Sequence, residues 1–334
     1  MIIKMKLVHS LLLLVSWICL SSSQKLMSWQ EYKVTFEKEF LNSEHETRHA
    51  QIFEETLDLI QSHNERYAKG LENYNLGINQ FSDLPSEKLK SFSGYGLAWK
   101  SNTTELEEVL LEKYSGKDPL PSTVDWVKGG AVTSVKDEKN CHGHWAFSAI
   151  GAVEGAYFMY ARKLKELSAQ QIIDCDVLDK GCNGGAMINA YGYLTKNQAE
   201  SEFHYPYRAR DNRCTYDPRL GEIPFVRRYM RPPQDLFTIM QVLAQYGPHS
   251  IGINSSPQSF IRYRSGVYDD PQCDPYHLNR GALLVGYGTV FGKDYWLVKN
   301  SWGRSWGDWG YIKILRSHLN LCGVINDVTL PSFT

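Results

Sequence analysis

The chain has 334 residues, of which 43% are hydrophobic, 13% aromatic and 22% charged. This is the composition of a globular protein with a sizeable core, and the length exceeds that of one average domain. The 36 basic and 37 acidic residues give a formal net charge of −1. Because this balance provides no attraction to nucleic acid or to an acidic membrane surface, we expect neither partner.

The N-terminus has the pattern of a secretory signal peptide. Lys4 and Lys6 precede a largely apolar run at residues 7–20, which ends in the small residues 21–23. A charged start, a short apolar stretch and small residues are typical of such signals. The alternatives are a buried helix or a membrane anchor, but the run is too short to span a bilayer comfortably. We therefore predict a signal peptide at residues 1–23 and delivery into the secretory pathway, to a lysosomal or an extracellular destination.

The cysteine count agrees with an oxidising compartment. Of the seven cysteines, Cys19 lies in the predicted signal peptide. An even number remains, which leaves no spare thiol if all of them pair, and the spacing alone does not choose among the possible pairings. The remaining cysteines are Cys141, Cys175, Cys182, Cys214, Cys273 and Cys322.

The first part after the signal is charged and predicts helices. Residues 28–66 carry apolar side chains at three- and four-residue spacings, and residues 77–84 form a turn-rich strand or loop. Residues 85–87 can begin another helix, and residues 101–120 are a polar linker with a glycosylation acceptor at Asn102. The apolar positions of the helical stretch are Tyr32, Phe36, Phe40, Ile52, Phe53, Leu57 and Ile60.

After Pro121 the sequence predicts a helical half followed by a strand-rich half. Residues 145–160 form a long apolar helix whose one strong charge is Glu154, and Ser168 with Gln171 has the spacing of a helix cap. Apolar runs follow at residues 248–253, 282–287, 295–299 and 310–314, separated by Gly, Asn and Pro. This order of elements predicts an α+β fold.

Several segments resemble those of papain-family cysteine proteases of the cathepsin L type. Residues 132–155 resemble the active-site segment of that family. Four further segments follow in the family's order: GCNGG at 181–185, YPY at 205–207, GALLVGYG at 281–288 and KNSWG at 299–303. Upstream, the family's proregion motif is matched by Gly77, Asn79, Phe81 and Asp83.

A second proregion motif, on the helix, is only partly retained. Phe53, Ile60 and Asn64 fit it, whereas Thr56 replaces an Asn. Glu44 and Arg48 lie one residue out of step, so that His45 and His49 occupy the expected positions.

The resemblance implies a two-lobed papain-like fold, with a helical left lobe and a β-barrel-like right lobe, preceded by a helical inhibitory proregion that lies across the cleft. We predict the proregion at residues 24–118 and the peptidase domain at residues 119–334. The resemblance also implies disulfides that each close a loop of about 40–50 residues, worth about 3–4 kcal/mol in the chain-entropy model. The implied pairs are Cys141–Cys182, Cys175–Cys214 and Cys273–Cys322.

The positions that carry the family's chemistry are substituted. The family uses a thiolate at the N-terminus of the long helix, directly before the Trp-Ala-Phe run, and this residue is His144 here. The position of the catalytic histidine holds Arg280, which stays protonated and cannot act as a general base. The oxyanion-hole glutamine is replaced by Glu138, whose carboxylate donates no hydrogen bond. Asn300, which would orient the imidazole, and Trp302, which would shield it, are retained.

Three other interpretations of these residues are open. Ser148 lies one helical turn past His144, which permits a Ser–His pair. His142, His144 and Glu138 suggest a metal site, although Arg280 would repel a cation, and we expect neither a metal nor a cofactor. The most economical interpretation is an ion pair between Glu138 and Arg280.

The residues for recognition are better retained than those for catalysis. Gly184 and Gly185 match the edge on which the family docks an extended peptide backbone. Asp327 would lie at the floor of the main specificity pocket and favour a basic or polar side chain. A second glycosylation acceptor, Asn254, lies beside this pocket. The walls implied by the resemblance are Ala186, Met187, Ser255, Leu278 and Gly281.

From these residues we expect a catalytically inactive, monomeric cathepsin L-like homologue. It would bind peptides, a protease inhibitor or another protein through its cleft, in addition to its own proregion. The alternatives are an active lysosomal or secreted cysteine endopeptidase and a purely structural protein.

Overall fold

The computed structural model describes residues 27–90 and 120–334, which form two compact units, one ending at Lys38 and one beginning at Glu39. The predicted signal peptide and the glycosylation acceptor Asn102 lie outside the described residues. The first unit contains α1 (Trp29–Thr35), which begins with a capping box between Ser28 and Glu31. In the described residues, no helix is both long enough and apolar enough to cross a membrane.

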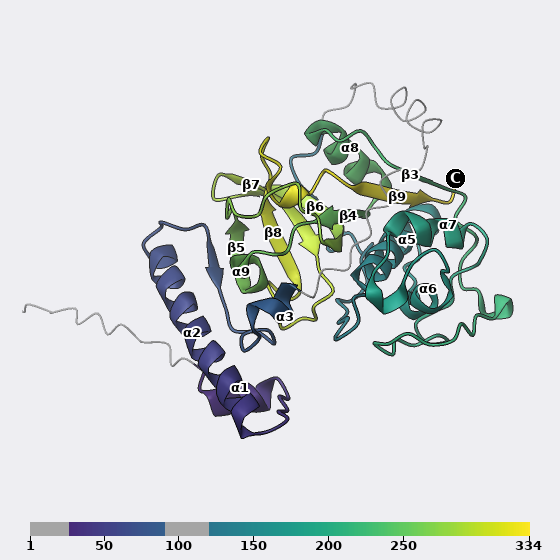
Figure 1. The fold of residues 1–334 in the computed structure, drawn as a ribbon. Coiled ribbons are helices and arrows are strands. Elements are labelled where there is room, and N and C mark those ends of the chain that lie inside the picture. The colour runs from purple at the N-terminus through teal and green to yellow at the C-terminus, as the bar shows by residue number, and fades with distance from the viewer. Residues whose placement is uncertain (1–26, 91–119) are drawn as a thin grey trace, which may run out of the picture. The chain divides into compact units, whose positions relative to one another are not determined.

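The second unit begins with the helix that carries the partly retained motif. Asn42 caps α2 (Ser43–Ala68) by accepting a hydrogen bond from the backbone N–H of His45. Strand β1 (Tyr74–Leu76) and helix α3 (Ser86–Lys90) follow. Figure 1 shows α2 and β1 running beside each other before α3.

The strands form one mixed sheet. Its order is β1-β5-β8-β7-β6-β4-β9-β3, with β2 paired to β6, and the ladders are antiparallel except that between β5 and β8. The strand order is an open path, so the right lobe is an open sheet in its hydrogen bonding. The strands are β2 (Val124–Asp125), β3 (Arg228–Met230), β4 (His249–Ile253), β5 (Tyr263–Tyr268), β6 (Arg280–Val290), β7 (Lys293–Lys299), β8 (Tyr311–Leu315) and β9 (Val328–Ser332).

The long apolar helix predicted at residues 145–160 is confirmed as α5 (His144–Ala161). It packs against β6 and β4, and two of its glycines allow the close approach: a Cβ at Gly151 would lie 2.9 Å from Leu283 in β6, and one at Gly155 would lie 2.7 Å from Pro248, which precedes β4. The predicted cap is also confirmed, because Ser168 accepts from the N–H of Gln171 at the start of α6 (Ala169–Cys175). Helices α7 (Met187–Leu194), α8 (Leu236–Tyr246) and α9 (Gln258–Ile261) complete the set described.

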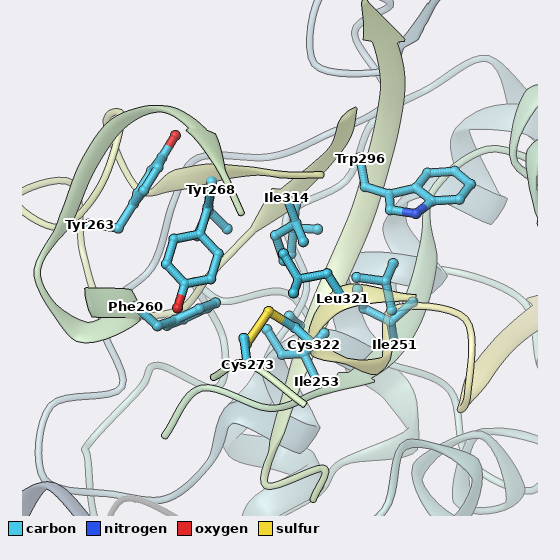
Figure 2. Close-up of a cluster of buried hydrophobic side chains, with 14 of the residues drawn as sticks. Ile251, Ile253, Phe260, Tyr263, Tyr268, Cys273, Trp296, Ile314, Leu321 and Cys322 are labelled. Carbon is cyan, nitrogen blue, oxygen red and sulfur yellow. A yellow bond between two sulfur atoms is a disulfide. The ribbon is translucent and has the colours of Figure 1, made fainter. Parts of the chain in front are cut away.

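Within the described residues, the two largest hydrophobic clusters correspond to the two predicted lobes. One lies among α5, α6 and α7, and the other lies on the sheet, where Figure 2 shows Phe260, Tyr268 and Ile314 beside the Cys273–Cys322 disulfide. The second cluster also includes residues from the N-terminal segment, so that segment and the sheet share one core. These residues are Ile60, Tyr74, Leu76, Phe81 and Leu89.

All three implied disulfides are confirmed: Cys141–Cys182, Cys175–Cys214 and Cys273–Cys322. Cys141–Cys182 joins the segment before α5 to the GCNGG segment. His142 adds a backbone hydrogen bond of 3.1 Å to the carbonyl of Cys182. The start of α5 is therefore fixed to the predicted docking edge.

Candidate functional site: the substituted catalytic centre

His144 is the first residue of α5 and is fully buried. Its Nδ1 accepts a hydrogen bond of 3.1 Å from the backbone N–H of Gly281. Because Nδ1 acts as an acceptor, a neutral ring must carry its proton on Nε2. Burial lowers the pKa of His144 well below its ordinary value, and the positive charge of Arg280 lowers it further, so the ring is neutral.

Arg280 and Glu138 form a buried ion pair, as the sequence predicted. Nη1 of Arg280 lies 2.6 Å from Oε1 of Glu138, and neither side chain is more than 4% exposed. Burial raises the pKa of Glu138 and lowers that of Arg280, and each charge opposes the shift of its partner. The guanidinium of Arg280 stays protonated at any relevant pH, and its positive charge favours the ionised form of Glu138. We therefore interpret the contact as an ion pair.

Trp302 covers this ion pair. The guanidinium carbon of Arg280 lies 4.2 Å from the centre of the Trp302 ring, which is the geometry of a cation–π contact. Asn300 also has a local role, because its Oδ1 accepts the backbone N–H of Ser301 at 2.8 Å. Trp302 thus packs against a guanidinium at the position where, by resemblance, the family places an imidazole, whereas the bond of Asn300 is to its neighbour along the chain.

Ser148 is held in the interior. Its Oγ donates a hydrogen bond of 2.5 Å to the carbonyl oxygen of Ala282. This hydroxyl is therefore engaged with β6, and a Ser–His pair with His144 is not the arrangement found. Within residues 27–90 and 120–334, no group of three or more His, Cys, Asp or Glu side chains could hold a metal ion.

A small cavity of about 30 Å³ lies behind His144, with Ser148, Glu154 and Lys299 among its lining residues. It has room for water but not for a peptide side chain. Burial lowers the pKa of Lys299 to about 8, and the charge of Glu154 opposes this shift. Lys299 donates to the carbonyl of Thr133 at 3.0 Å, so these buried charges belong to the interior of the fold.

The predicted docking edge is built tightly on the start of α5. A Cβ at Gly185 would lie 2.6 Å from ring atoms of Trp145, and Gly184 has a φ of 107°. Trp145 in turn donates from Nε1 to the carbonyl of Gly181 at 3.1 Å. Glycine is therefore required at both positions, by close approach at one and by backbone conformation at the other.

The predicted pocket residues come together in part. A Cβ at Gly281 would meet Met187 Sδ at 3.2 Å, and Ser255 bonds Asn279, the residue after Leu278. Ala186, Met187, Ser255 and Asp327 are all buried.

The charge assigned to Asp327 has an internal partner that the sequence did not indicate. Nη1 of Arg231 lies 3.0 Å from Oδ1 of Asp327, and both side chains are largely buried. The expectation that Asp327 selects a basic ligand side chain therefore loses its basis. No motif marks Arg231, so only the fold could bring the two together.

The second glycosylation acceptor, Asn254, is buried in the fold beside the predicted pocket. Asn254 is 2% exposed, and its Nδ2 donates to the backbone and to the carboxylate of Asp274, both at 3.1 Å. A glycan on this nitrogen would disrupt these hydrogen bonds.

The N-terminal segment contacts the residues around the substituted centre. Phe81 meets Trp302 edge to face at 5.0 Å, and Gln80 donates to the carbonyl of Trp302 at 2.6 Å. Asn79 donates to the carbonyl of Ile261 at 2.8 Å, and β1 adds a strand to β5. The retained proregion motif therefore covers the Trp302 side of the centre.

The substituted motif positions on α2 also have partners. Nδ1 of His49 lies 2.9 Å from Oδ2 of Asp83, and Thr56 accepts a hydrogen bond of 3.0 Å from Arg262. Asn64 bonds both the N–H and the carbonyl of Leu76 at 2.9 Å. The helix is thus connected to β1, to the Asp83 turn and to the segment before β5.

Comparison with known proteins agrees with this architecture. The model of the papain family cysteine protease matches residues 120–332, and that of the cathepsin propeptide inhibitor domain (I29) matches residues 29–89. The chain belongs to the papain family of cysteine proteases and carries a cathepsin-type propeptide. The boundaries at residues 23 and 118 remain predictions.

Its relatives include cathepsins, and a procathepsin is among the similar solved structures. Mouse (Mus musculus) cathepsin S is 40% identical over 308 residues, covering 91% of this chain and 89% of that protein. Cathepsin L of Sarcophaga peregrina is 37% identical over 311 residues, covering 91% and 92%. Among solved structures, digestive procathepsin L 3 from the larval midgut of Tenebrio molitor has a TM-score of 0.82 at 32% identity, covering 91% of this chain and 98% of that one.

Proposed function

We propose that this papain-family chain does not hydrolyse peptide bonds and acts instead by binding a peptide or protein in its cleft. The observation that carries the proposal is the buried Arg280–Glu138 ion pair, with 2.6 Å between its charged atoms and Trp302 against it. It occupies the positions at which the family holds its general base and an oxyanion-hole donor.

The imidazole of His144 does not replace the missing thiolate. A nucleophilic imidazole needs a nitrogen lone pair that can reach the substrate. Nδ1 of His144 already accepts the N–H of Gly281, and the neutral ring then carries its proton on Nε2. Arg280 cannot take up a proton from an attacking group. This chain therefore lacks both the nucleophile and the general base that the family's mechanism requires.

The oxyanion position argues in the same direction. Glu138 offers acceptors where the reaction needs a donor, and losing one such donor costs about 10²–10³ in rate. The loss of the nucleophile and base removes the reaction itself, so even a restored donor would leave the chain inactive.

The recognition edge supports a binding role. Gly184 and Gly185 retain the backbone path that accepts an extended peptide, and Trp145 and the Cys141–Cys182 disulfide hold that path in place. The ligands we propose are an extended peptide, a protease inhibitor or another protein. We place the chain in the secretory pathway, as a lysosomal or extracellular monomer, since its disulfides suit an oxidising compartment.

The test combines turnover and covalent labelling. The purified chain, before and after removal of the propeptide by an added protease, is assayed with dipeptidyl fluorogenic substrates from about pH 4 to about pH 7. In parallel it is treated with an epoxide probe directed at cysteine. We expect no turnover and no label. Turnover that survives His144→Ala but disappears with Ser148→Ala would overturn the proposal and support the alternative of an active endopeptidase.

A further inference from the structure

Two carboxyl groups lie in the turn that leads to the docking edge. Asp176 is the C-cap residue of α6, and Asp179 follows in the same turn. Oδ1 of Asp176 accepts the N–H of Leu178 at 3.0 Å. Oδ1 of Asp179 accepts from the N–H of Ala186 at 3.1 Å and from Nδ2 of Asn189 at 3.0 Å. All three donors are neutral.

The second oxygen of each carboxyl group is buried. Within the described chain, Oδ2 of Asp176 and Oδ2 of Asp179 have no hydrogen-bond donor. The two carboxyl groups belong to one turn, three residues apart, and are close enough for each to influence the pKa of the other. Since ionised carboxylates have only acceptors, neither group can donate to the other, whereas one proton shared between them would satisfy both oxygens. Two ionised carboxylates at this distance would repel.

The surroundings favour retention of that proton. Burial is the largest influence on both groups; it raises the pKa of Asp176 and that of Asp179, the latter to about 7, and the charge of Asp176 adds to the rise at Asp179. The charged residues nearby do not offset this. Asp174 on α6 bonds Gln170 and Tyr205, Asp211 accepts the N–H of Cys182, and Lys180 is exposed.

Asp179 and Lys180 hold the docking edge from Gly184 to Ala186. The carboxyl carbon of Asp179 would lie 2.7 Å from a Cβ at Gly185, and its Oδ1 bonds the next residue, Ala186. Lys180 donates its backbone N–H to the carbonyl of Gly184 at 2.9 Å. The conformation of the edge from Gly184 to Ala186 therefore depends on where Asp179 lies.

We infer that Asp176 and Asp179 share one proton, and that this shared proton holds the Gly184–Ala186 edge in its ligand-ready form in acid and releases it as the proton is lost. Asp179 is a positioning residue, acting through the backbone of the edge. The use of the edge by a ligand rests on the proposed function; the proton and its effect on the edge do not.

The direction of the pH dependence follows from linkage. A carboxyl group whose pKa is raised on folding binds its proton more tightly in the folded state. Its contribution to stability is present below the ordinary pKa of an aspartate and is lost as pH rises through about 7. The edge is thus most ordered at acid pH and loosens toward neutral pH.

The test uses amide variants that mimic the shared proton. Asp179→Asn keeps Oδ1 as the acceptor for Ala186 and places an N–H donor toward Asp176. Asp176→Asn does the same from the other side, which keeps the test available if one variant fails to fold. Asp58→Asn, on the exposed face of α2, is the matched control.

Hydrogen exchange of the Ala186 amide in the full chain is the readout, corrected for the intrinsic effect of pH. We expect exchange in the unaltered chain and in Asp58→Asn to be at least about tenfold faster above the transition than below it. In either amide variant the exchange should be nearly constant across this range. If protection of the Ala186 amide from exchange in the unaltered chain did not depend on pH, the inference would be overturned.

A second arm separates this inference from the proposed function. Binding of a fluorescent phenylalanyl-arginine amide is measured after the propeptide has been removed by an added protease. Tighter binding in acid that becomes pH-independent in Asp179→Asn supports both. A pH-dependent Ala186 amide with no peptide bound at any pH supports the shared proton and counts against the proposed function.

Discussion

Nη1 of Arg280 lies 2.6 Å from Oε1 of Glu138, and both side chains are buried against Trp302. Glu138 precedes α5 and Arg280 is the first residue of β6. The pair therefore links the segment before the helix to the sheet, at the positions that match the family's catalytic centre. Buried ion pairs of this kind contribute little net stability when intact, but the loss of one partner is costly.

Breaking this pair on one side should destabilise the protein strongly. Glu138→Met leaves a buried guanidinium without its counter-charge, and Arg280→Met leaves a buried carboxylate; each should lower the free energy of unfolding by about 3–5 kcal/mol. The double variant removes both charges and should cost clearly less than the sum. Chemical denaturation of the three variants gives the coupling energy. Additive costs would show that the two charges do not depend on each other.

Rebuilding catalysis should need more than a thiol. His144→Cys restores a nucleophile at the start of α5, but Arg280 cannot pass a proton to the leaving amine. His144→Cys with Arg280→His should regain partial activity, and adding Glu138→Gln should raise the rate by about 10²-fold or more because it restores an oxyanion donor. The measurement is turnover of a dipeptidyl fluorogenic substrate after the propeptide has been removed by an added protease.

The single variant is the informative control in that series. If His144→Cys alone turned over at the rate of the triple variant, the roles assigned to Arg280 and Glu138 would be wrong. The unaltered chain should give no signal in the same assay.

The propeptide should remain attached in the purified protein. The proposed absence of peptidase activity means that the chain would not cut its own linker at residues 101–120, and Phe81 and β1 share the core of the sheet. We expect an unchanged mass after incubation at neutral and at acid pH, when the protein is made in cells lacking lysosomal cysteine proteases. Spontaneous conversion to a chain beginning near residue 119 would contradict both this prediction and the proposal that the chain has no peptidase activity.

Phe81 should account for much of the attachment. It is largely buried and packs against Trp302, so Phe81→Ala should cost about 3–5 kcal/mol. An added protease should then cut the variant faster than the unaltered chain, measured as the half-life of the full-length band. The exposed Leu41→Ala is the control and should leave that half-life unchanged.

Asn254 should carry no glycan. Its side chain is buried and bonded to Asp274, so Ser256→Ala, which removes the acceptor motif, should leave the mass of the secreted protein and its response to glycosidase unchanged. A loss of mass equal to one glycan would show that Asn254 is reached during folding, contrary to this prediction.

His249 should make the fold sensitive to acid. Burial lowers the pKa of His249 to about 4. At a pH between about 4 and the ordinary histidine pKa, this side chain is therefore protonated in the unfolded chain but neutral in the folded chain. Stability attributable to His249 is therefore present at neutral pH and falls as the pH drops below about 6.5, by about 3 kcal/mol in total. Denaturation of the unaltered chain and of His249→Asn across this range should show a steeper acid loss in the former. Parallel curves would contradict the assignment.

Much of the fold was accessible from local patterns. The apolar run at residues 145–160 and the Ser168 cap predicted α5 and the start of α6, because these signals depend on neighbours along the chain. Strands β3, β5 and β9 were not predicted as such, since their pairing partners lie far away in sequence. The Arg280–Glu138 pair was predicted because two motif positions had changed to opposite charges together.

The sequence by itself was enough to predict that the family's thiol and general base are replaced, because that is a question of which residue stands at a motif position. Only the tertiary structure decided what surrounds those residues: the N–H of Gly281 on Nδ1 of His144, Arg231 beside Asp327, and the burial of Asn254. The physical reason is that charge neutralisation and desolvation depend on groups brought together across the fold, and residue identity alone does not specify which groups these are.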